Sequence, residues 1–207
     1  MPTLLTNGGP VIWLIMFAAA IALVTFIERV LYCHRSQINS AAFLNGVRTV
    51  LKRDNVVEAI SICDATPGPI AHLVKTAILN RDRGRERVRE AVEEAGLTEV
   101  PRLEEKLNLL ATIAQIAPLL GLLGTIIGFM DIFSSMQEAG LYTHFEQLSR
   151  GIWRALICAA AGIAVAIFVH AGYNYLVSRI NKIVLDMERA AAEIVNIVTE
   201  NGNGHPE

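Results

Sequence analysis

Three long stretches of the chain are strongly apolar and contain no Asp, Glu, Lys or Arg: 1–27, 107–130 and 155–178. An α-helix rises about 1.5 Å per residue, so roughly 20 residues cross the apolar core of a bilayer. The second and third stretches exceed that length, whereas the apolar run of the first, 11–27, is at its short end. The pattern predicts an all-α membrane protein. Its three transmembrane helices are expected over 11–30, 106–133 and 154–178.

The first apolar stretch has a second interpretation, a secretory signal peptide that is removed from the mature protein. Such peptides carry Lys or Arg ahead of the apolar run. Here no Lys or Arg precedes Val11, whereas Arg29 and Arg35 follow the run. We therefore favour a retained span.

The segment 31–105 is expected to form a helical domain. Apolar residues at helical spacing predict a helix over Ile38–Arg53, and Asp54 is a candidate cap for a second one. Thr66–Pro69 contains two prolines and a glycine, which predict a break before the next helix, Ile70–Asn80. The charged run Asp82–Arg89 is most simply a solvated helix face or loop.

Two long helices are expected to continue from the spans into this domain. We expect Gly96 to end one helix and Thr98 to start another, with Pro101 in its first turn. No stop signal separates that helix from the second span, so the two should form one rod of more than 30 residues. The third span should likewise continue as a helix over 179–200, because its apolar periodicity does not end, and 201–207 should be disordered.

Lys and Arg near the span ends predict the orientation. The N-terminal residues have none, whereas basic residues follow the first and third spans. The N-terminus is therefore expected outside and the C-terminus in the cytoplasm. This makes 1–10 a short periplasmic tail, 31–105 cytoplasmic and 134–153 a short periplasmic loop.

The remaining composition excludes several function classes. Only 18% of residues are charged, 53% are hydrophobic and the net charge is −2, which argues against disorder and against nucleic-acid binding. The three cysteines form no CxxC pair and the five histidines have no metal-ligand spacing, so we expect no metal or cofactor. No catalytic motif is present, so we expect no enzyme.

Small residues mark the second and third spans. Gly121, Gly124 and Gly128 superficially resemble a phosphate loop, but no strand precedes them and no Lys follows. Their spacing favours close helix packing, as does Gly162 after three alanines in the third span. Pro118 should kink or loosen the second span.

Three polar side chains in the spans have open interpretations. The Thr125 hydroxyl either bonds back to the preceding turn or faces an aqueous or partner-filled pore, and Thr112 has the same alternatives. His170 is either a functional ionisable group or a neutral, hydrogen-bonded or interfacial residue. No Asp or Glu lies deep in any span. If protons cross here, the carboxylate must come from a partner, with His170 the only internal candidate.

The stretch Ile116–Met130 closely resembles the signature of the MotA/TolQ/ExbB proton channel family. Further similar segments are Glu28–Arg29, Pro101–Glu104, Ala155–Ile157, Ala160–Ile167 and Tyr173–Asn174. The three-span layout resembles the ExbB/TolQ branch.

The resemblance implies a homo-oligomer, a pentamer, in the bacterial cytoplasmic (inner) membrane. Its partner would be an ExbD/TolR-like protein with one span and a membrane Asp, and a TonB/TolA-like protein is a further candidate. The second and third spans would line the pore, where Thr125 matches a pore-facing threonine. The candidate pore-lining or proton-pathway residues are Thr125, Thr112, Cys158, Ala159 and His170.

Three positions depart from the pattern that the resemblance implies. Ala159 stands where a threonine is usual, Arg154 where Glu is common and Phe168 where proline is common. Cys158 is a poor substitute for the lost hydroxyl, because a thiol is a weak hydrogen bonder. The leading hypothesis is a ring subunit of a motor driven by the proton motive force. The alternative is a scaffold that keeps the assembly and does not conduct.

Overall fold

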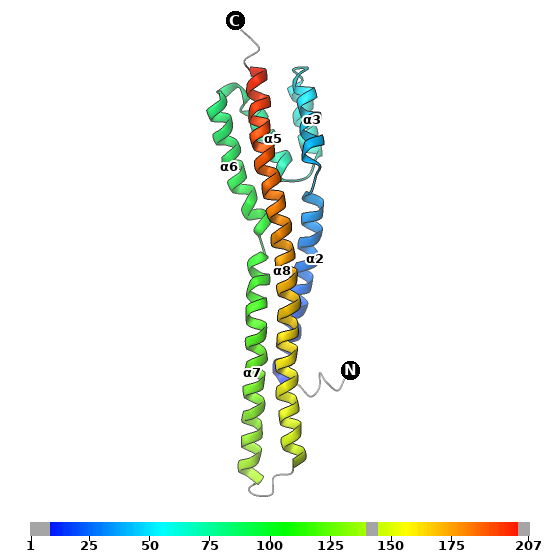
Figure 1. Ribbon diagram of the computed structural model, residues 1–207, viewed down its shortest axis with the longest axis vertical. Coiled ribbons are helices and arrows are strands. Elements are labelled where there is room, and N and C mark those ends of the chain that lie inside the picture. Colours follow the sequence, from blue (N-terminus) through cyan, green and yellow to red (C-terminus); the bar gives the residue numbers. More distant parts are fainter. Residues whose placement is uncertain (1–8, 140–144, 203–207) are drawn as a thin grey trace. The chain divides into compact units, whose positions relative to one another are not determined.

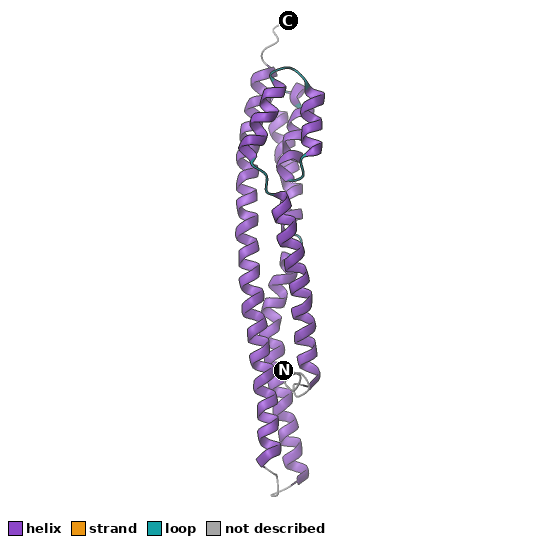
Figure 2. Ribbon diagram, turned by 90° about the vertical axis from the view of Figure 1, so that its right-hand side faces the viewer, coloured by secondary structure: helices purple, strands orange, loops and turns teal. Residues whose placement is uncertain are grey.

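The computed structural model describes residues 9–139 and 145–202, which are helical almost throughout and contain no strand (Figure 2). The prediction of an all-α chain is confirmed. In chain order the elements are α2 (Gly9–Ser36), α3 (Ser40–Leu51), α4 (Val56–Ala65), α5 (Pro69–Leu79), the 3-10 turn η1 (Arg81–Arg83), α6 (Arg85–Glu104), α7 (Leu107–Ala139) and α8 (Phe145–Gly202). Figure 1 labels all of them except α4 and η1.

Three helical runs are long and apolar enough to cross a membrane, by length and composition. They contain the three predicted spans. The helices also continue through much of the predicted loop 134–153, since α7 ends at Ala139 and α8 begins at Phe145. The predicted tails fall largely outside the described residues.

The chain divides into two compact units. The first, called the apolar unit, comprises Met1–Glu28 and Lys106–Tyr175, and the second, called the polar unit, comprises Arg29–Glu105 and Leu176–Glu207. Within the apolar unit, α7 and the first part of α8 are antiparallel neighbours. A side-chain carbon built on Gly124 would lie 3.2 Å from Val11, and one on Gly172 would lie 3.0 Å from Phe26, so α2 contacts both helices.

The polar unit has an apolar core to which α3–α6 and the last part of α8 contribute. The stripe predicted on α8 is buried at Leu176, Ile180, Ile183, Met187, Ala190 and Ile194. These positions repeat every three or four residues, which places them on one helix face. Helix α6 is one partner of this part of α8, since Arg85 donates to Asn196 at 3.1 Å and Val92 and Val195 line the same hollow. Buried residues of α3–α6 in the same unit include Leu44, Val47, Leu73, Val74, Val88 and Val92.

The predicted break at Thr66–Pro69 is confirmed, because α4 ends at Ala65 and α5 begins at Pro69. The sequence predicted Asp54 as the cap of α4, which is one residue before the observed cap. Asn55, not Asp54, precedes the helix and accepts a hydrogen bond from the backbone N–H of Glu58 at 3.3 Å. Its amide also donates to the Glu58 carboxylate at 2.7 Å, a reciprocal arrangement that satisfies the first turn.

The expectation that Gly96 ends a helix and Thr98 starts another is wrong. Helix α6 runs through both Gly96 and Pro101 to Glu104. A glycine costs only about 1 kcal/mol inside a helix, and burial of Val88, Val92 and Leu103 outweighs local preference.

The expected rod from α6 into the second span is also wrong. The helix ends at Glu104, Glu105 is extended (ψ 139°), and Lys106 has a left-handed backbone (φ 64°) before α7 begins at Leu107. Left-handed backbone costs a non-glycine residue about 1–2 kcal/mol, so a helix cannot pass through it. The charged side chains described below stabilise this break.

Candidate functional site

Glycines on α7 bring its backbone into contact with α8. A side-chain carbon built on Gly124 would lie 2.7 Å from Cβ of Cys158, and one built on Gly128 would lie 3.0 Å from Cβ of Ala155. On α8, one built on Gly162 would lie 2.6 Å from the carbonyl oxygen of Ala117. At Gly124 and Gly162 these separations are shorter than a side-chain carbon tolerates, so a larger residue would displace its neighbours, and at Gly128 the contact would be tight. We call this contact of Gly121, Gly124 and Gly128 with α8 the glycine seam.

The glycine seam sets an antiparallel register along the two helices. Gly121 faces Gly162 and Ala159, Gly124 faces Cys158, and Gly128 faces Ala155. Cys158 is only 1% exposed because it fills the space above Gly124. Helix α7 continues through Pro118 as a single helix.

Thr125 lies beside the glycine seam and is half-buried. Its hydroxyl is within donating distance of two carbonyl oxygens, that of Gly121 one turn earlier at 3.0 Å and that of Ala155 on α8 at 3.2 Å. The bond back to the preceding turn is therefore present, and a contact between helices accompanies it. A hydroxyl that donates still has lone pairs that can accept a hydrogen bond.

The structure does not bring the two predicted threonines together. Thr112 lies 13 residues before Thr125 in α7, about 20 Å along the helix. It is exposed and donates to the carbonyl oxygen of Asn108 at 2.7 Å. His170 is also exposed, with its ring centroid 6.3 Å from that of Tyr173.

Arg154, which stands where the resemblance leads one to expect Glu, has an acidic neighbour. Its guanidinium lies 3.6 Å from the carboxylate of Asp131 on α7, just beyond the last glycine of the seam. Both side chains are partly exposed. The charge reversal on α8 is therefore balanced by an acidic residue on the facing helix.

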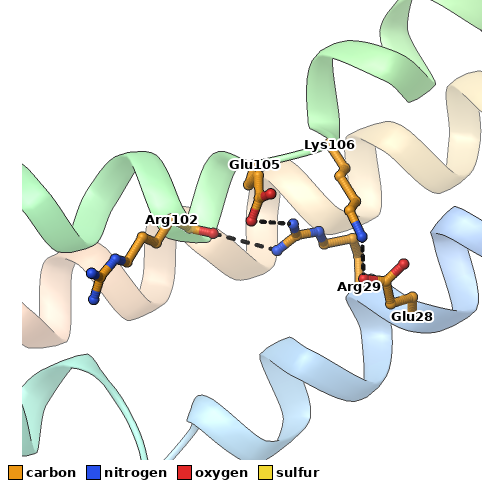
Figure 3. Close-up of polar contacts among 5 residues, drawn as sticks. All are labelled: Glu28, Arg29, Arg102, Glu105 and Lys106. Atoms are coloured by element: carbon orange, nitrogen blue, oxygen red, sulfur yellow. Dashed lines mark hydrogen bonds and ion pairs between the residues drawn. The ribbon is translucent and has the colours of Figure 1, made fainter.

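Two consecutive residues of α2, Glu28 and Arg29, form ion pairs at the break before α7 (Figure 3). Arg29 is 3% exposed, and its Nη2 donates to the Glu105 carboxylate at 3.0 Å. Its Nη1 donates to the carbonyl oxygen of Arg102 at 3.3 Å, which satisfies the end of α6. Separately, Glu28 pairs with Lys106.

Sequence reasoning noted Glu28–Arg29 only as a similarity and missed these pairs. A usable signal was the order of charges, because Glu28–Arg29 and Glu105–Lys106 are complementary when matched in antiparallel order. The Nε atom of Arg29 has no hydrogen-bond partner among the described residues. Among those residues, no group of three His, Cys, Asp or Glu side chains is placed to hold a metal ion.

The sequence model of the MotA/TolQ/ExbB proton channel family matches residues 65–189, which is more than half of the chain. That range contains α7, the glycine seam and Thr125. The chain belongs to the MotA/TolQ/ExbB proton channel family. As a member, it is a membrane protein of a transport and channel family, with three helices able to span the bilayer.

Individual relatives agree with this assignment. A protein of Methanothermobacter thermautotrophicus named as a homolog of the biopolymer transport protein ExbB is 27% identical over 84% of this chain and 62% of its own length. An ExbB-like biopolymer transport protein of Synechocystis is 33% identical over 83% of this chain and 68% of its own. The Tol-Pal system protein TolQ of Haemophilus influenzae is 34% identical over 51% of this chain and 46% of its own. The chain thus spans less than two thirds of the first and third of these relatives.

Proposed function

We propose that the chain is the ring subunit of an ExbB/TolQ-like motor that couples the proton motive force to mechanical work. The ring is a homo-oligomer, a pentamer, in the bacterial cytoplasmic membrane. It surrounds an ExbD/TolR-like partner with one span and a membrane Asp, and a TonB/TolA-like protein receives the work. The N-terminus is periplasmic and the C-terminus cytoplasmic.

The observation that carries this proposal is the absence of any Asp or Glu from 107–130 and 155–178 in a member of a proton channel family. Proton pathways through a membrane normally use carboxylates or histidines. The ring therefore needs a partner that supplies the carboxylate.

The apolar unit has the surfaces that a ring in a membrane requires. Large apolar side chains of α7 and α8 remain exposed in the single chain, among them Leu119, Leu122, Ile126, Phe129, Leu156 and Ile163. Neighbouring copies, the partner helix and lipid would cover them.

Thr125 is the proposed contact for the partner's carboxyl group. When that group is protonated, its O–H donates to the free lone pairs of the Thr125 hydroxyl. When it is ionised, the neutral wall of the pore offers it no cation. The field does about 2.3 kcal/mol of work per elementary charge per 100 mV, which drives the cycle in one direction.

A non-conducting scaffold is the second candidate function. Its support is the three departures in the third span: Ala159 lacks the usual hydroxyl, Arg154 reverses a common charge and Phe168 replaces a common proline. In that case the ring would assemble with its partner, and no protons would cross.

Proton flux through vesicles that contain the chain and its partner tests both proposals. We expect Thr125→Val, which removes only the hydroxyl, to lower flux about tenfold, equivalent to roughly 1.4 kcal/mol of barrier. Thr125→Ser should keep more of the flux than Thr125→Val. Thr49→Val in α3 is the matched control, because the Thr49 hydroxyl also bonds back to its own helix, at 2.8 Å, and lies in the polar unit.

The outcomes separate the candidates. Flux that is equal in wild type and Thr125→Val would remove the pore role of this threonine. An assembled wild-type complex without flux would instead support the scaffold.

A further inference from the structure

An apolar groove of about 470 Å³ lies within the apolar unit, and all three of its helices contribute to it. Its lining includes Ala19, Leu23, Leu110, Val165, Phe168 and Gly172. The hollow exists because small residues form part of its wall, notably Ala19 and Gly172. Large side chains stand at its rim, where Leu23 is 60% and Phe168 78% exposed.

The chemistry of the lining indicates which occupant the groove favours. An acyl chain is narrow, flexible and fully apolar. It matches a groove whose named lining offers no polar side chain.

The position of the groove along the helices favours a phospholipid. Every lining residue lies within one of the charge-free stretches, 1–27, 107–130 or 155–178. Leu110 is one helical turn after Lys106, whose ammonium is partly exposed and has three donors, one of which meets Glu28. A lipid with its tail along Leu110 can therefore place its phosphate near a cation.

We propose that this groove is a binding site for one membrane glycerophospholipid, with an acyl tail along α2, α7 and α8 and the phosphate beside Lys106. A bound lipid fills a hollow that water would not enter and stabilises the three-helix packing. The lipid site does not depend on proton conduction. A negative result for lipid binding would therefore leave the proposed function intact, and loss of the proposed function would leave the lipid site intact.

Neighbouring alanines of α2 provide a matched test. Ala19 lines the groove, whereas Ala20 is exposed and does not. The full-length chain is purified from membranes in mild detergent, and its retained phospholipid is measured by mass spectrometry. The melting temperature is then recorded with and without added phosphatidylglycerol, since a ligand of the folded state raises it.

We expect wild type and Ala20→Phe to retain phospholipid and to melt at a higher temperature when phosphatidylglycerol is added. Ala19→Phe should lose both effects, because its ring fills the groove. Equal retention and an equal melting shift in the two variants would overturn the proposal.

A second pair of variants guards against misfolding of Ala19→Phe. Phe168→Ala removes an exposed rim side chain and should lower phospholipid retention on the order of tenfold. Leu156→Ala, on the same helix and also exposed (58%), should not. Cysteine cross-linking in membranes tests whether protein occupies the groove. If Phe168→Cys formed a disulfide with a second copy of the chain, a neighbouring protein would lie at the groove, and this result would reject the lipid site.

Discussion

The Cys63 thiol shows how burial changes the chemistry of a single residue. It is 3% exposed in the polar unit. Burial, together with the neighbouring Asp64 carboxylate and against the opposing charge of Lys75, raises its pKa to about 11. The thiol therefore stays protonated when the chain is folded at neutral and mildly alkaline pH.

This pKa predicts a loss of stability at high pH. Between pH 9 and 11 the unfolded chain has ionised this thiol and the folded chain has not, so the folded state holds more protons and stability falls as pH rises. We expect Cys63 to contribute a loss of about 1–2 kcal/mol over that interval. Denaturant unfolding of the full chain at pH 8.5 and 10.5 measures it. In Cys63→Ala the decrease should be smaller, and an unchanged decrease would contradict the assignment.

Residue-level features could be read from sequence where the signal is local. The close-packing glycines and the three charge-free stretches are visible as patterns along the chain, whereas the pore role of Thr125 stays a prediction. The burial of Arg29 and its bonds to Glu105 and Arg102 were not predicted, because their partners lie more than 70 positions away in sequence. No local rule specifies which distant carboxylate a basic residue meets.

At the scale of elements, the glycine seam leads to a stability prediction. Gly162→Ala would place a methyl group 2.6 Å from the carbonyl oxygen of Ala117 and 2.8 Å from Cα of Gly121. Both contacts are with backbone, so the helices must separate. We expect a destabilisation of about 1–3 kcal/mol, measured by thermal unfolding in detergent.

Gly46→Ala is the control for this substitution. Gly46 lies inside α3 and a side-chain carbon there meets nothing within 4 Å. The alanine should therefore raise stability by roughly 0.5–1 kcal/mol through helix preference alone. If both substitutions stabilised the chain, the close approach of α7 and α8 would be wrong.

Helix boundaries show where local rules fail. The break at Thr66–Pro69 was predictable because proline and glycine act on their own backbone. The continuity of α6 through Pro101 and the break at Glu105–Lys106 were not. In both places the outcome depends on buried side chains and ion pairs that local sequence does not specify.

At the scale of the whole molecule, the distribution of Lys and Arg predicts the orientation in the membrane. Green fluorescent protein fused after Glu207 should fluoresce, because that end is expected in the cytoplasm. Alkaline phosphatase fused after Gly140, between the second and third spans, should be active, because that loop is expected outside. If the green fluorescent protein fusion did not fluoresce and the phosphatase fusion were inactive, with both proteins present at normal levels, the predicted orientation would be wrong.

The sequence by itself determined the class of the protein: an all-α chain with three apolar spans, a family signature in the second span and no Asp or Glu in the stretches 1–27, 107–130 and 155–178. These properties follow from composition and from periodicities of a few residues. Only the tertiary structure decided the register of the glycine seam, the contacts of Thr125 and Arg29, the break before α7 and the apolar groove. Each of these depends on which distant side chains meet in space, and that is set by the packing of whole helices.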